Sequence, residues 1–133
     1  MNIKKPRRKC KNCNKECSKP AKFYCNNICQ SKYQNQFKIQ KWLNGDEVGY
    51  KTNGQTKSFI RNYLISKANS SCELCGWDKK NLTTNKSTLE VHHKDGNYKN
   101  NTINNLQILC PNCHSLTESY KNLNKGKGRE QRI

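Results

Sequence analysis

Apolar residues are sparse in this chain and fall into four short stretches separated by polar segments. The first stretch, QSKYQNQFKIQKWL from Gln30 to Leu43, places large apolar residues at roughly helical intervals, at Tyr33, Phe37 and from Ile39 to Trp42. This spacing predicts a helix with Cys29 near its start and those residues as its packing face, because large apolar residues are more often buried than exposed.

The second stretch follows Ser58, where FIRNYLISKAN predicts a short helix with Phe59, Tyr63 and Leu64 on one side. Ser58 is placed to cap this helix, because a serine hydroxyl can accept a hydrogen bond from a free amide of the first turn. Between the two helices, residues 43–57 carry three glycines and few apolar side chains, which is typical of a linker or loop.

The last two stretches predict strands. Leu89 to His93 alternates apolar and polar residues, and the run from Leu106 to Leu109 is short and apolar. Between them, Asp95-Gly96-Asn97 is a turn sequence and the polar residues 98–104 predict a loop. Pro111 suits the first turn of a helix that continues through CHSLTESYKNL, so the predicted order is strand, loop, strand, helix.

The core that these elements can form is small. Only 32% of the 133 residues are apolar, and nine of those are cysteines. Domains with thin cores usually need metal ions or disulfides for stability. The chain opens with MNIKKPRRK and shows no stretch resembling a signal peptide, so we expect a reduced cytoplasm and zinc sites rather than disulfides.

Eight of the nine cysteines occur in closely spaced pairs that are typical of zinc ligands. The pairs are Cys10 and Cys13, Cys25 and Cys29, Cys72 and Cys75, and Cys110 and Cys113. The two downstream pairs predict one structural zinc with all four positions filled, and the two upstream pairs predict a second zinc in an N-terminal knuckle. Cys17 is left over, as a replacement for Cys13 or as a free thiol, and the spacing favours Cys13 as the ligand.

The charge of the chain predicts a polyanionic partner. Twenty-six lysine and arginine residues face nine aspartate and glutamate residues, giving a formal net charge of +17. Nucleic acid explains this imbalance better than a membrane, because no strongly amphipathic apolar face is present and no stretch could span a bilayer. The basic ends, residues 1–11 and 124–133, are expected to contact phosphates.

All three histidines lie in one run from Leu89 to His114, LEVHHKDGNYKNNTINNLQILCPNCH. His92 and His93 are adjacent on a predicted strand, so their side chains should point to opposite faces and serve different roles, one as a metal ligand and one as a base. Histidine titrates near neutral pH, and a cation held by few side chains keeps positions for phosphate oxygens and water. The run therefore contains the parts of a metal-dependent phosphodiesterase.

The sequence resembles the HNH nucleases, in particular small phage and bacterial HNH endonucleases with an N-terminal zinc-binding segment. The segments that carry the resemblance are FYCNNICQSKYQ, HxDGNYxNN, NNLQILCPNCHSLT and KNLNKGKGR. The resemblance implies a small, zinc-stabilised α+β fold, with a treble-clef-like ββα-metal finger beside an N-terminal zinc knuckle and helix. The expected organisation is an arm and zinc segment at 1–42, a linker at 43–57 and a nuclease domain with a basic tail at 58–133.

The resemblance also implies roles for individual residues. His93 aligns with the first histidine of the HNH pattern and implies the general base that activates water. His92 and His114 imply ligands of a catalytic divalent cation, Mg²⁺ or Mn²⁺, although Mn²⁺, Ni²⁺ and Zn²⁺ bind imidazoles more tightly than Mg²⁺ does. Asn105 aligns with the asparagine of the pattern and implies a brace for the loop that helps to hold the base. Asp95 belongs to a recurring DGN loop and is expected to shape it.

The expected function is a metal-dependent endonuclease that hydrolyses DNA to 5′-phosphate and 3′-hydroxyl ends, by nicking or by double-strand cleavage. A homing-type, packaging-associated or otherwise phage-encoded enzyme fits the frequent lysine and asparagine, which are typical of AT-rich genomes, and would act in the host cytoplasm. The alternative is a non-enzymatic double zinc-finger protein that binds DNA or RNA, which would not need the histidines. The sequence indicates no small-molecule substrate and no oligomeric state.

Overall fold

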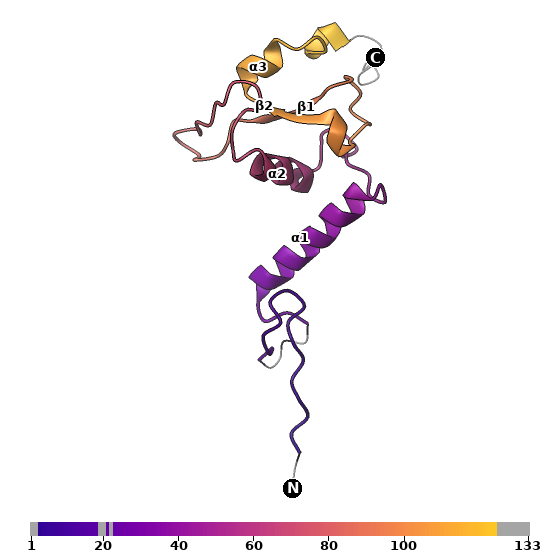
Figure 1. Cartoon of the computed structure of the whole chain (residues 1–133), viewed down its shortest axis with the longest axis vertical. Coiled ribbons are helices and arrows are strands. Elements are labelled where there is room, and N and C mark those ends of the chain that lie inside the picture. Colours follow the sequence, from indigo (N-terminus) through magenta and orange to yellow (C-terminus); the bar gives the residue numbers. More distant parts are fainter. Residues whose placement is uncertain (1–2, 19–20, 22, 125–133) are drawn as a thin grey trace. The chain divides into compact units, whose positions relative to one another are not determined.

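The computed structural model describes residues 3–18, 21 and 23–124 (Figure 1). The first two residues of the basic arm and the predicted basic tail from residue 125 onward lie outside these ranges. Close contacts divide the chain into two compact units, 1–41 and 42–133. No helix in the described ranges is long and apolar enough to cross a membrane.

The first unit consists of a cysteine-containing loop followed by helix α1 (Asn27–Leu43), whose last two residues belong to the second unit. Backbone hydrogen bonds close the loop. The amide of Cys10 donates to the Lys15 carbonyl at 2.7 Å, and the amide of Cys17 donates to the Arg8 carbonyl at 2.9 Å. These bonds fold the chain back on itself and bring the first cysteines of the chain together.

Helix α1 occurs where the apolar spacing predicts a helix, and it begins at a capping side chain. The side-chain oxygen of Asn26 accepts a hydrogen bond from the Cys29 amide at 2.8 Å, which satisfies one of the amides left free by the first turn. The predicted packing face is only partly correct, because Phe37 is 55% exposed whereas Trp42 is buried. Phe37 instead lies under the Lys41 ammonium, 4.9 Å from its ring centroid.

The second unit follows the predicted order of strand, loop, strand and helix, preceded by a short helix (Figure 1). Its two strands pair antiparallel, with His92 opposite Gln107 and His93 opposite Leu106. The chain is therefore a small α+β protein, as the sequence predicts. The elements of this unit are α2 (Ser58–Lys67), β1 (Glu90–His93), η1 (Ile103–Asn105), β2 (Leu106–Leu109), α3 (Pro111–Ser115) and η2 (Lys121–Asn124).

The apolar core of the second unit lies around its two-stranded sheet. Its largest fully buried side chains are Ile60 from α2, Leu89 just before β1, and Ile108 and Leu109 from β2. Each contributes about 1.5–3 kcal/mol of hydrophobic stabilisation when fully buried. The burial of so few side chains cannot offset the conformational entropy that a unit of this size loses on folding. Further cross-links are therefore needed.

Ser58 does not cap helix α2, contrary to the sequence prediction. It is the first residue of the helix, and Lys57 occupies the cap position without a side-chain hydrogen bond to the helix. The Lys57 ammonium pairs with Glu47 at 2.6 Å, and its amide donates to the Gly49 carbonyl at 2.9 Å. The preceding loop thus fixes the start of α2 in place of a serine cap.

Helix α3 is also shorter than predicted and ends at Ser115. The hydroxyl of Ser115 donates to the Asn112 carbonyl at 2.7 Å, and the hydroxyl of Thr117 donates to the His114 carbonyl at 2.8 Å. Hydroxyl groups of this kind compete with backbone amides for helical carbonyls. The predicted single helix is therefore divided into α3, a turn and η2.

The loop between β1 and β2 is held at Asn101 by the last turn of α1 and by the segment that follows it. The Trp42 indole donates to the Asn101 carbonyl at 2.6 Å, and its ring packs edge-on against Tyr63 with centroids 5.7 Å apart. Gly49 is buried against the same asparagine, and a Cβ at Gly49 would lie 2.5 Å from the Asn101 Cβ. Residues 43–57 therefore pack within the second unit and restrict this loop.

Replacing Gly49 with alanine is expected to destabilise the second unit by about 1–3 kcal/mol, because the added methyl overlaps the Asn101 side chain. The measurement is the chemical denaturation midpoint of the zinc-loaded chain. The matched control is Asn62→Ala at an exposed position of α2, which should change stability by less than about 0.5 kcal/mol. Equal midpoints for Gly49→Ala and the unsubstituted chain would show that this contact does not hold the loop.

Candidate functional site

Two groups of four cysteines bring their sulfur atoms together. Within each group, all four Sγ atoms lie within 4.8 Å of one another. In tetrahedral zinc sites with bonds of about 2.3 Å, neighbouring sulfurs lie about 3.8 Å apart. All nine cysteines are free thiols, so both groups could hold a structural zinc. The groups are Cys10, Cys13, Cys25 and Cys29 in the first unit, and Cys72, Cys75, Cys110 and Cys113 in the second.

The electrostatics of the two groups also favour a cation. Desolvation would raise the pKa of Cys72, but hydrogen bonds from nearby backbone amides outweigh it and lower the pKa to about 6. Hydrogen bonding to Cys75, together with the other cysteines, raises the pKa of Cys113 to about 12. The first group shows the same division, with the pKa of Cys10 at about 6 and that of Cys25 at about 12. A bound divalent cation would allow all four thiols to ionise.

Cys17 lies outside the first group, which contains Cys13 instead. Its side chain is buried, and burial followed by the charges of the neighbouring cysteines raises the pKa of its thiol. The structure therefore places Cys17 beside the cluster as a buried neutral thiol. This arrangement agrees with the spacing argument that favours Cys13 as the ligand.

Glu73 joins the second cysteine group to the sheet by hydrogen bonds. The Glu73 amide donates to the Ile108 carbonyl at 3.0 Å, and its carboxylate accepts a hydrogen bond from the Ile108 amide. The turn around it is closed by the Cys72 amide, which donates to the Trp77 carbonyl at 2.8 Å. Gly76 completes the turn with a φ of +78°, a conformation that favours glycine. The edge of β2 and the cysteine turn thus form one rigid piece.

His92 and His114 face each other from β1 and α3, with ring centroids 5.4 Å apart. His92 is 7% exposed, and its ring forms no hydrogen bond within residues 3–18, 21 and 23–124. Burial, and then the nearby His114 and other positive groups, lower the pKa of His92. His92 is therefore neutral near pH 7, which is the form that binds a metal ion.

Glu90 orients the His114 ring from the same face of β1 as His92, because residues two apart on a strand share a face. The Glu90 carboxylate lies 2.5 Å from Nδ1 of His114. This pairing leaves Nε2 of His114 as the nitrogen that can bind another group. Tyr120 packs edge-on against the His114 ring, with centroids 5.4 Å apart, and limits its rotation. Glu90 was not predicted from the sequence, where its only signal is its position two residues before His92.

His93 has a different partner, the buried side chain of Asn101. The His93 Nε2 atom lies 2.8 Å from Asn101 Oδ1, and Asn101 Nδ2 donates to the Tyr98 carbonyl at 2.8 Å. Because Oδ1 can only accept, a neutral His93 carries its proton on Nε2 and has a free lone pair on Nδ1. Asn101 is a residue that the sequence reasoning missed. Its only signal there is its place in the stretch HxDGNYxNN.

Asn105 lies in the hydrogen-bond network of the loop between β1 and β2. Its Nδ2 donates to Asp95 Oδ1 at 2.9 Å and to the Asn100 carbonyl at 2.8 Å, and its Oδ1 accepts from the Asp95 amide at 3.1 Å. Desolvation opposes ionisation of Asp95, but hydrogen bonds from Asn100, Asn97 and Asn105 outweigh it and lower the pKa of this carboxyl. These contacts connect both ends of the loop that carries Asn101.

A groove of about 830 Å³ opens over the histidines. His92, His93 and His114 all line it, so the structure brings the three predicted histidines to one cavity, whereas Asn105 is outside its lining. The basic side chains in the lining come from segments far apart in the sequence and were not predicted as a set. They are Lys51, Arg61 and Lys121.

Comparison with known proteins places part of the chain near a known family. Residues 72–119 match the model of the HNH endonuclease family. The chain is also 43% identical over 65 residues to the H-N-H endonuclease F-TflIV of Escherichia phage T5. That alignment covers 47% of this chain and 26% of the relative, so the chain spans about a quarter of the relative's length. No solved structure matches the chain significantly. The resemblance predicted from the sequence is thus confirmed for residues 72–119, which are similar to the HNH endonuclease family.

The chain is expected to bind two zinc ions, and Cys110→Ser is expected to reduce this number to one. Metal content after desalting measures the loss, and a thermal melt should show that the second unit has unfolded, because zinc at such sites supplies on the order of 10 kcal/mol. The matched control is Cys17→Ala, which should retain both ions because Cys17 lies outside the clusters. A Cys110→Ser chain with two zinc ions and an unchanged melt would contradict the structural site.

Proposed function

We propose that this chain is a metal-dependent endonuclease that hydrolyses phosphodiester bonds in DNA. The observation that supports this most directly is the division of the histidines between two partners. His93 is fixed by Asn101, whereas His92 and His114 face each other beside Glu90. The HNH match over residues 72–119, and the endonuclease name of the phage relative, support the same reaction class.

His93 is the general base in this proposal. With its Nε2 proton donated to Asn101 Oδ1, its Nδ1 lone pair is available to accept a proton from a water molecule in the groove. A neutral imidazole suits this task because its ordinary pKa lies close to neutral pH. Proton transfer of this kind typically contributes about 10²–10⁴-fold to a rate.

His92 and His114 are the proposed ligands of the catalytic divalent cation. The donor set fits, because the nitrogens of His92 have no hydrogen bond among the described residues and Nδ1 of His114 is already occupied by Glu90. Glu90 holds the His114 ring in place. Mg²⁺ or Mn²⁺, when bound, would supply positive charge to the scissile phosphate and the leaving oxygen. Imidazole donors bind Mn²⁺ more tightly than Mg²⁺, which suggests testing both.

The remaining parts of the proposal concern fold and substrate. The order β1, β2, α3, with ligands on β1 and α3, supports a treble-clef-like ββα-metal finger, and the first cysteine group supports a separate N-terminal knuckle.

The basic groove residues Lys51, Arg61 and Lys121 would contact DNA phosphates. Expected products carry 5′-phosphate and 3′-hydroxyl ends. A single catalytic centre favours one nick per binding event, in the cytoplasm of a phage-infected cell.

His93→Ala is expected to lower cleavage by at least about 10²-fold while DNA binding and zinc content stay unchanged, because the base is lost and the cysteine groups are not touched. The assay is relaxation of a supercoiled plasmid with Mg²⁺, with Mn²⁺ and with a chelator, with zinc content checked in each sample. Asn62→Ala serves as the control and should cleave normally. Native-rate cleavage by His93→Ala would exclude this residue as the base. A folded, zinc-loaded, DNA-binding wild-type chain that cuts no substrate would favour the binding-module alternative.

Asn101 is expected to act as a positioning residue for His93. Asn101→Leu removes the oxygen acceptor at similar volume and should lower kcat by about 10–100-fold with little change in KM. Asn101→Asp keeps an oxygen for the His93 Nε2 proton and should recover part of the rate. The measurement is the kcat and KM of nicking, with melting midpoints as a control for folding. Equal kcat losses for the two variants would indicate that the asparagine has only a structural role.

A further inference from the structure

The loop of residues 78–88, named here the tip loop, connects the second cysteine group to β1 and extends away from the sheet (Figure 1). Its conformation is set by its own hydrogen bonds. Asn81 Oδ1 accepts from the amides of Thr83 and Thr84, both at 2.9 Å, and the Asn81 amide donates to the Lys86 carbonyl at 3.0 Å. These bonds form a closed turn, which holds the residue between Asn81 and Thr83 in a fixed position.

That residue is Leu82, whose side chain is fully exposed. The other residues of this turn, Asn81, Thr83, Thr84 and Asn85, are polar and uncharged. A large apolar side chain held outward by a closed polar turn cannot contribute to the core of the chain. It can lose its contact with water only against a binding partner.

The base of the tip loop is tied to the strand that carries His92. Arg61 of α2 donates to the Leu89 carbonyl at 2.8 Å and to the Ser87 carbonyl at 3.3 Å. Leu89 is fully buried and directly precedes β1. The position of Leu82 is therefore fixed relative to the histidine groove through a short, hydrogen-bonded connection.

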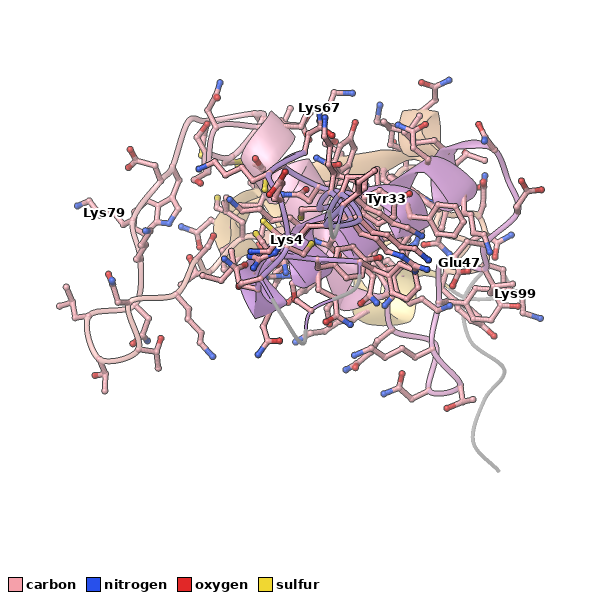
Figure 2. All side chains as sticks on the ribbon, turned by 90° about the horizontal axis from the view of Figure 1, so that it is seen from below. Lys4, Tyr33, Glu47, Lys67, Lys79 and Lys99 are labelled. Carbon is pink, nitrogen blue, oxygen red and sulfur yellow. The ribbon has the colours of Figure 1, made fainter. Side chains whose placement is uncertain are left out.

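The charge of the tip loop identifies the chemistry of its partner. Its lysines are all exposed, and its one acidic residue is Asp78, at the base of the loop. Figure 2 labels Lys79 on this loop, and its ammonium lies 5.5 Å from the centroid of the Trp77 ring. An apolar tip surrounded by lysines matches a duplex, which offers phosphates along both edges of a groove and stacked bases within it. The lysines are Lys79, Lys80 and Lys86.

We propose that the tip loop enters the minor groove of duplex DNA and that Leu82 inserts between two base pairs, unstacking them and bending the duplex. This inference rests on the proposed DNA substrate and adds a device for recognising it. Apolar side chains that act in this way bend DNA by about 20–90°. Because pyrimidine–purine steps unstack most easily, the enzyme selects sites with a TA or CA step at the position of Leu82.

The test uses the full-length, zinc-loaded chain with His93→Ala, so that the DNA stays uncut. End-labelled duplexes report bending by energy transfer, and 2-aminopurine at a central TA step reports unstacking. Adding Leu82→Asn should abolish both signals, whereas adding Leu82→Met should retain them. The matched control is Val48→Asn, which changes another exposed apolar residue of the same unit and should have no effect.

Salt dependence separates insertion from phosphate contact. Leu82→Asn should leave the slope of log Kobs against log salt concentration unchanged, whereas Lys80→Ala with Lys86→Ala should reduce it by about two, roughly one for each lost contact. Equal DNA bending by the His93→Ala chain with and without Leu82→Asn would overturn the proposal. So would a loss of self-association in sedimentation without a change in bending, because Leu82 would then contact a second copy. A chain that bends DNA through Leu82 but never cleaves it would support this inference and refute the nuclease.

Discussion

The second unit depends on the clustering of four sulfur atoms. Cys72, Cys75, Cys110 and Cys113 come from two turns that are far apart in the sequence, and their Sγ atoms lie within 4.8 Å of one another. The apolar core around them is too small to fix the relative positions of these turns. A tetrahedral ligand set supplies that constraint, because it specifies both the distance and the direction of each side chain.

The geometry of the histidine site follows from this constraint through short covalent and hydrogen-bonded connections. His114 directly follows Cys113, so the cysteine group sets the position of one histidine on α3. Glu73 joins the opposite turn to the edge of β2 through Ile108, and β2 aligns β1 with its two histidines. His114 and His93 are each then oriented by one further side chain, Glu90 for His114 and Asn101 for His93. The structural cluster and the histidine site are therefore two parts of one framework.

The sequence predicted those features that depend on local spacing. The helix α1, both strands and the cysteine groups follow from periodicity or ligand spacing, which a short stretch of chain determines. Helix α3 was predicted too long and Ser58 was wrongly predicted as a cap, because hydroxyl and lysine contacts in the folded chain compete with local preferences. Asn101 and the basic groove residues could not be found in this way. Asn101 gains its role only when Gly49, Trp42 and the loop between the strands come into contact, and the basic residues meet at the groove only in the folded chain.

The contact between Trp42 and the Asn101 carbonyl also determines where this protein can be divided. The glycine-rich sequence after α1 resembles a natural place to separate the zinc knuckle from the remainder of the chain. A fragment that starts at Ser58 would lose both the indole donor and the close packing of Gly49, which together hold the loop that orients His93. The shortest chain that keeps His93 in this arrangement must therefore include the last turn of α1. The N-terminal unit should accordingly be exchanged for another module at a point before Trp42.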